Sequence, residues 1–228
     1  MKRFLLTVLL LLTLAGCSTV PEAAAVPKGA ENDTRTEAYG HGDAARMAYE
    51  ALMSGDASLL DEENARLWAL QDWTEFIQSD DFTYEYTYLD ADGDGQDELL
   101  LQMEDDPRTY SGVFHYEDGK LFCWNHDRVE MSCQSYPLRD GTMVRQYEYN
   151  DSISYTIFRY QPDGDFEALT TLYYRGNPLW DEDIRPYPWY GIDNEELTEA
   201  EFGEEFQARI TDQLLDRSAW TVIEQNQE

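Results

Sequence analysis

Hydrophobic residues recur with two different periods along this chain, and the change of period divides it into helical and extended parts. Over residues 44–53, and again within 62–78, apolar side chains recur every three or four positions, as on one face of an α-helix. The first stripe is Met47, Ala48 and Leu52, and the second is Leu67, Leu70, Trp73 and Ile77. Over 82–88 aromatic residues alternate with Thr and Glu, which is the period of a strand. The pattern predicts two helices followed by a sheet.

The next ninety residues predict a run of antiparallel strands joined by tight turns. Asp-Gly pairs at 118–119, 140–141 and 163–164, and Asn-Asp at 150–151, are residues typical of hairpin turns. The predicted strands are 82–88, 99–103, 113–116, 121–124, 129–136, 143–149, 153–160 and 166–174. Segments 114–119 and 158–164 resemble each other, which we interpret as a repeated hairpin pattern because two weak copies do not establish a propeller. One β-meander of seven to eight strands is expected.

The last predicted element is a helix whose start is marked by the sequence. Thr198 and Glu201 have the spacing of a capping box, in which each side chain bonds the backbone N–H of the other residue. Phe202, Phe206, Ile210 and Leu214 follow at four-residue steps. This predicts an amphipathic helix to about residue 215 that packs on the sheet. The expected fold class is α+β, with residues 41–228 forming a single domain.

The first residues have the features of an export signal. Lys2 and Arg3 precede an apolar run over 4–14, which is too short to span a bilayer. The run ends in Leu14-Ala15-Gly16-Cys17, which resembles a bacterial lipobox. The resemblance implies that residues 1–16 are a signal peptide, that Cys17 carries acyl chains such as palmitate, and that the protein is anchored on the extracytoplasmic side of the membrane. The aperiodic segment 17–40 is expected to be a disordered tether.

The acidic composition narrows the classes of partner. With 47 Asp and Glu against 16 Lys and Arg, the chain has a formal net charge of −31. Such a surface repels nucleic acid and anionic lipid, so contact with the membrane is expected through the lipid anchor only. Hydrophobic residues make up 42% of the chain, which is enough for a folded core. The partner that remains is an unidentified protein or glycan.

One segment carries explicit ligand chemistry, and we call residues 90–98 the acidic loop. Asp90, Asp92 and Asp94 place carboxylates at loop positions 1, 3 and 5, and Gly95 stands at position 6. A hard cation such as Ca²⁺ needs several oxygens around one point on a sharply turning backbone. The predicted ligands are completed by the main-chain carbonyl of Gln96 and by Glu98, directly or through water. Asp97 is expected to point outward, and a turn without metal remains the alternative.

The acidic loop resembles two families of calcium loops. It departs from the EF-hand at position 12, where Leu101 stands in place of the bidentate Glu. It is more similar to the D-x-D-x-D-G-x-x-[DE] loops of FG-GAP repeats, which join two strands. The segment from Tyr88 to Leu99 also resembles a segment that is common in uncharacterised lipoproteins of Firmicutes. These resemblances imply a structural Ca²⁺ site and no activity; with one ligand fewer than an EF-hand, we expect a Kd of roughly 10⁻⁴ to 10⁻³ M.

The cysteines and histidines define no catalytic arrangement. Cys123 and Cys133 flank a predicted turn, and their spacing leaves a disulfide and two buried thiols equally open. The three histidines are His41, His115 and His126, with no nucleophile motif near them. The sequence therefore favours a non-catalytic binding or scaffold domain over an enzyme.

Two other functions compete with the scaffold. A carbohydrate-binding module could stack sugar rings on aromatic residues of the irregular segment 177–193. Those residues are Trp180, Tyr187, Trp189 and Tyr190. A hydrolase needs only two positioned carboxylates, so a chain this acidic gives that hypothesis almost no specific support.

Overall fold

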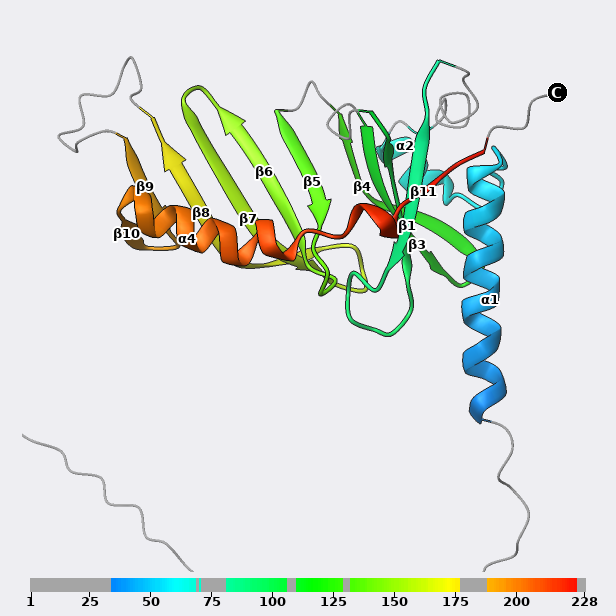
Figure 1. Cartoon of the computed structure of the whole chain (residues 1–228). Helices are drawn as coiled ribbons and strands as arrows, with labels where there is room; N and C mark the ends of the chain where they lie inside the picture. The colour runs from blue at the N-terminus through cyan, green and yellow to red at the C-terminus, as the bar shows by residue number, and fades with distance from the viewer. Residues whose placement is uncertain are drawn as a thin grey trace, which may run out of the picture.

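The strands form two antiparallel sheets, so the prediction of one meander is wrong, although the α+β class is correct (Figure 1). The computed structural model describes residues 34–68, 70, 81–105, 110–128, 132–176 and 188–224. The first sheet has the order β11-β1-β2-β3-β4 and the second β10-β9-β8-β7-β6-β5. The first contains β1 (Tyr84–Leu89), β2 (Glu98–Met103), β3 (Tyr110–Glu117), β4 (Lys120–Arg128) and β11 (Thr221–Val222). The second contains β5 (Cys133–Pro137), β6 (Met143–Tyr149), β7 (Ser152–Tyr160), β8 (Phe166–Arg175), β9 (Trp189–Ile192) and β10 (Glu195–Leu197).

The N-terminal helices belong to the core of the first sheet. α1 (Thr34–Met53) begins inside the segment expected to be a tether, and α2 (Glu62–Leu67) is capped by Asp61, whose side chain accepts two backbone N–H groups. Residues of α1 pack with strand residues in one buried cluster, which includes Ala45, Ala48, Tyr49, Leu52, Leu99, Leu101, Phe114 and Leu121. Met47 is 71% exposed, so its place in the predicted stripe is wrong. Residues 71–78 of the second predicted helix lie outside the described residues.

The C-terminal helix packs on one face of the second sheet, whereas a single sheet was predicted beneath it. α4 (Glu199–Arg209) starts with the complete capping box of Thr198 and Glu201. Phe206 meets Tyr155 with ring centroids 4.8 Å apart, and Phe202 packs in the same cluster. The helix ends at Arg209 rather than near residue 215, and two short 3₁₀ turns, η3 (Thr211–Gln213) and η4 (Arg217–Ala219), lead back to the first sheet.

The two sheets contain the same four-stranded unit. β1–β4 and β5–β8 are both antiparallel meanders in which each strand pairs with the next. A register shift interrupts the third pairing of each unit, between Val113 and Phe114 in one and between Ile157 and Phe158 in the other. Phe114 and Phe158 are both fully buried. The similar hairpin segments of the sequence therefore occupy equivalent places in two units.

A separate apolar cluster joins the units, and we call it the junction core. It contains Ala91, Leu100, Val113, Trp124, Met143, Phe158 and Tyr160. Ala91 belongs to the acidic loop and is 0% exposed. The loop that links β1 to β2 therefore lies where the first sheet meets the second.

Candidate metal site

The acidic loop is folded around its own carboxylates. Asp90 accepts the N–H of Gly93 at 2.7 Å with one oxygen and the N–H of Gly95 at 3.1 Å with the other. Both glycines have positive φ, +86° and +91°, which other residues rarely adopt. Asp92 accepts the N–H of Asp94 at 3.0 Å in the same way. The chain therefore turns sharply at the predicted glycine, with the aspartate side chains on the inside of the turn.

These turns bring the three predicted aspartate ligands together. Asp90, Asp92 and Asp94 each offer a carboxylate oxygen, and the three oxygens lie within 4.8 Å of one another. Oδ2 of Asp92 is buried and makes no hydrogen bond among the described residues. Burial raises the pKa of Asp92, the N–H of Asp94 opposes the rise, and the negative charge of Asp94 adds to it. The attraction of a cation between these oxygens would offset both the repulsion and the desolvation cost.

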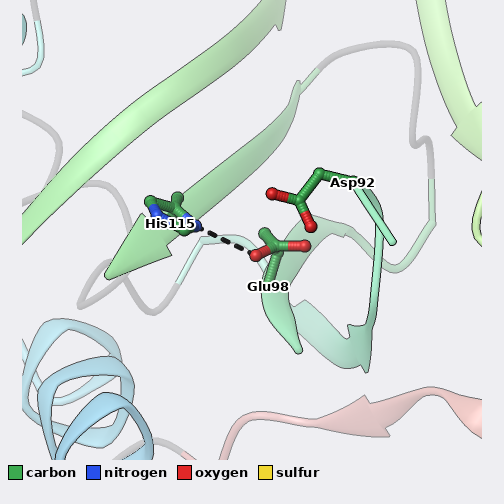
Figure 2. Close-up of side chains that lie close together, drawn as sticks. All are labelled: Asp92, Glu98 and His115. Atoms are coloured by element: carbon green, nitrogen blue, oxygen red, sulfur yellow. Dashed lines mark hydrogen bonds and ion pairs between the residues drawn. The ribbon is translucent and has the colours of Figure 1, made fainter. Parts of the chain in front are cut away.

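Glu98 forms a group with Asp92 and His115, separate from the group of the three aspartates. It is 0% exposed at the start of β2. Its Oε2 accepts the N–H of Ala91 at 2.8 Å, and its Oε1 lies 3.0 Å from Nδ1 of His115 (Figure 2). Burial raises the pKa of Glu98, while the bonds from His115 and Ala91 lower it. The buried carboxylate of Glu98 thus holds the backbone of the acidic loop from the side of the protein interior.

Asp92 connects two groups of ligand atoms. Besides the aspartate cluster, it forms a second group with Glu98 and His115, again within 4.8 Å (Figure 2). The His115 ring stacks on Trp124 at 4.3 Å and 14°, which fixes its plane. Sequence reasoning missed His115 because it lies 17 residues beyond Glu98, on β3. The sequence indicated the place of His115 only indirectly, because β3 was expected to pair with β2, the strand that follows the acidic loop.

The remaining loop residues lie at the rim. Gln96 donates from its backbone N–H and its side chain to the two oxygens of Asp94, at 2.6 and 3.2 Å. Asp97 points outward and pairs with Arg46 at 3.5 Å, as expected. A hollow of about 170 Å³ reaches the loop from the surface between Asp94, His115 and the β3–β4 turn. Solvent and small ions therefore have a path to Asp94 at the edge of the aspartate cluster.

The second sheet supports the outer side of the loop. At Gly141, in the β5–β6 turn, a Cβ would lie 2.2 Å from the carbonyl oxygen of Asp90, so the two backbones touch. Arg159 on β7 donates to the carbonyl oxygen of Asp140 at 3.0 Å. Its other terminal nitrogen would lie 3.3 Å from a Cβ at Gly93. The acidic loop is thus held between the two units.

The other predicted site residues are dispersed. Cys17, Trp180 and Tyr187 lie outside the described residues. Cys123 is a thiol that donates to the carbonyl oxygen of Asn125 at 3.2 Å, and no disulfide joins it to Cys133 in the structure.

The two aromatic residues that can be placed do not form one platform. Trp189 and Tyr190 are neighbours on β9 and therefore take opposite faces of the second sheet. The Tyr190 ring contacts Phe202 of α4, and the Trp189 ring contacts Tyr173. Tyr190 is therefore a packing residue beneath the helix.

Comparison with known proteins identifies the start of the chain alone. Residues 1–18 match the family of prokaryotic membrane lipoprotein lipid attachment sites. The chain matches no curated protein and no solved structure. Within the described part, no helix has the length and apolar character needed to cross a bilayer. The protein is a lipid-anchored membrane lipoprotein on the cell-surface side.

Proposed function

We propose that this lipoprotein is a non-catalytic binding or scaffold domain whose acidic loop, at the junction of the two sheets, binds a structural Ca²⁺ ion. The observation that carries the proposal is the convergence of Asp90, Asp92 and Asp94 at the contact between the sheets. All three offer hard oxygen ligands, which suit Ca²⁺ better than softer metals. The carbonyl of Gln96 and water would complete the coordination.

The position of Glu98 gives it a supporting role in this proposal. Both of its oxygens already have partners, the N–H of Ala91 and the ring of His115. It therefore fixes the backbone between Asp90 and Asp92 and adds negative charge behind the site. Each carboxylate oxygen keeps a second lone pair, so direct coordination of the ion would not require the loss of these bonds.

An ion at this place stabilises more than a hairpin. The loop contributes Ala91 to the junction core and contacts the β5–β6 turn, so ordering the loop also orders the packing between units. For a Kd of roughly 10⁻⁴ to 10⁻³ M, 10 mM Ca²⁺ would stabilise the folded state by about 1.4–2.7 kcal/mol. The net charge of −31 supports the further proposal that nucleic acid is not a partner.

Calcium titration by calorimetry on the mature lipoprotein in nanodiscs of neutral lipid tests the ion directly. Asp94→Asn removes the negative charge of one proposed ligand, and Asp97→Asn removes the same charge from a residue that points away. We expect one-site heat in the wild type and in Asp97→Asn, and at least tenfold weaker binding in Asp94→Asn. Absence of heat in the wild type up to 10 mM, about tenfold above the weak end of the expected range, would refute the proposal.

A further inference from the structure

The second sheet has one face under α4 and one face that α4 does not cover (Figure 1). Tyr155, Leu172 and Ile192 are paired across β7, β8 and β9 and pack in the cluster that contains Phe202 and Phe206 of the helix. Their sequence neighbours point to the opposite face. Two rows of directly paired residues lie there: Tyr147, Ser154, Tyr173 and Gly191, and Tyr149, Ser152, Arg175 and Trp189.

These rows form an aromatic groove of about 270 Å³. Tyr147 and Tyr149 on β6 make one wall, and both are well exposed, at 46% and 64%. Ser152 and Ser154 on β7 make a low floor. Because strands are spaced about 4.8 Å apart, the walls on β6 and β8 stand roughly 10 Å from each other. We use the name aromatic groove for this hollow.

The opposite wall is fixed by the backbone beneath it. The rings of Tyr173 and Trp189 lie 4.6 Å apart at 32°. The hydroxyl of Tyr173 donates to the carbonyl oxygen of Asp193 at 2.9 Å. At Gly191 a Cβ would come within 2.6 Å of the Tyr173 ring, so the ring lies directly on the glycine. These contacts hold the Tyr173 ring in place without a ligand, which lowers the entropic cost of binding.

The chemistry of the groove differs from that of the whole chain. Acidic residues number 47 of 228, yet the described lining of the groove contains no carboxylate, and its one charged side chain is Arg175. The rest of the polar lining that the structure describes is the hydroxyl groups of serine and tyrosine and the indole N–H of Trp189. A described lining without a carboxylate suits a ligand that is uncharged and rich in hydrogen-bonding oxygens.

We propose that the aromatic groove binds a short stretch of a neutral saccharide chain. Aromatic faces carry partial negative charge and take the C–H face of a sugar ring, while hydroxyl groups of the floor and rim bond the ring hydroxyls. A proline-rich peptide also uses aromatic grooves, but proline has no N–H, so it offers the serine floor mainly acceptors, whereas sugar hydroxyls both donate and accept. The saccharide would be the class of partner that the proposed scaffold binds. The aromatic groove does not include the acidic loop, so this proposal does not depend on the metal.

Binding is tested by calorimetry on the mature lipoprotein in nanodiscs, because glycoside detergents would compete. The probes are chitohexaose, cellohexaose and a proline-rich decapeptide, each with Ca²⁺ and with chelator. Tyr149→Ala shortens a wall, and Ser154→Trp fills the floor without removing an aromatic residue. Leu169→Ala is the control, because Leu169 is 51% exposed on β8 and does not line the groove.

We expect one of the two saccharides to bind, with affinity about tenfold lower in Tyr149→Ala and no measurable binding in Ser154→Trp. Leu169→Ala should bind as the wild type does. Failure of both saccharides to bind, binding of the peptide alone, or equal affinity in all four proteins would overturn the proposal. Retained binding with chelator would leave it standing even if the calcium titration fails.

Discussion

Gly141→Ala tests whether contact between the two units through the acidic loop matters for stability. Gly141 has a φ of +84°, and an added Cβ would meet a backbone atom, the carbonyl oxygen of Asp90, at 2.2 Å. Gly119 in the β3–β4 turn has nearly the same φ, +83°, with nothing within 4 Å of its Cβ position. The pair therefore separates the cost of backbone strain from the cost of the clash.

The expected magnitudes follow from these two costs. An alanine in the left-handed region costs about 1–2 kcal/mol, reduced by about 0.4–1 kcal/mol because alanine also restricts the unfolded chain. Gly119→Ala should thus lower the free energy of unfolding by roughly 1 kcal/mol. At Gly141 the neighbouring backbone must also move by more than an ångström, and overpacking of this kind costs about 1–3 kcal/mol more. The total for Gly141→Ala is about 2–4 kcal/mol.

Urea unfolding of both variants, followed by near-UV circular dichroism, measures the difference. Calcium affinity supplies a second readout, because a displaced Asp90 should weaken binding in Gly141→Ala and leave Gly119→Ala unchanged. Equal free energies of unfolding in the two variants would show that the loop does not press on the second sheet, and the reasoning for a junction site would then be wrong.

Three further changes probe other parts of the fold. Phe158→Ala, in the junction core, should lower the free energy of unfolding by about 3–5 kcal/mol in urea. Thr198→Ala should cost about 1 kcal/mol in the same assay by removing the cap of α4, while Thr198→Ser should cost little. The bond from Lys120, with that from the Asn64 N–H, holds the pKa of Asp61 below its ordinary value of 3.8. The stability that such a group contributes is present above pH 3.8 and is lost as pH falls through the lower folded pKa. Lowering the pH should therefore destabilise the wild type more steeply than Asp61→Asn. Parallel curves of unfolding free energy against pH would contradict this.

Local signals in the sequence predicted local structure well. The capping box of Thr198 and Glu201 marked the start of α4 correctly, because its two bonds depend on residues three apart. The Asp-Gly pairs marked turns for the same reason. The prediction for Met47 was wrong because a short stripe allows two helix faces, and Tyr49, two residues later, lies on the buried face instead.

The pairing of strands and the contact between sheets could not be predicted from such local signals. An alternation with a period of two residues indicates which face of a sheet a residue occupies. It does not indicate that β4 and β5 belong to different sheets. For the same reason Asp90, Asp92 and Asp94 were found by spacing, whereas His115 and Gly141 reach the acidic loop only through strand pairing and sheet contact. The aromatic groove likewise needs register across β6, β7, β8 and β9.

The duplicated unit explains why the acidic loop lies where it does. His115 and Arg159 follow the equivalent residues Phe114 and Phe158, and each supports the turn between the first two strands of its own unit. His115 does so by bonding Glu98, and Arg159 by bonding the carbonyl oxygen of Asp140. In the second unit that turn is short, whereas in the first it is extended by carboxylates and glycines and reaches across to Gly141. One copy of a common hairpin therefore carries the ligands, and the other supplies the surface against which they are held.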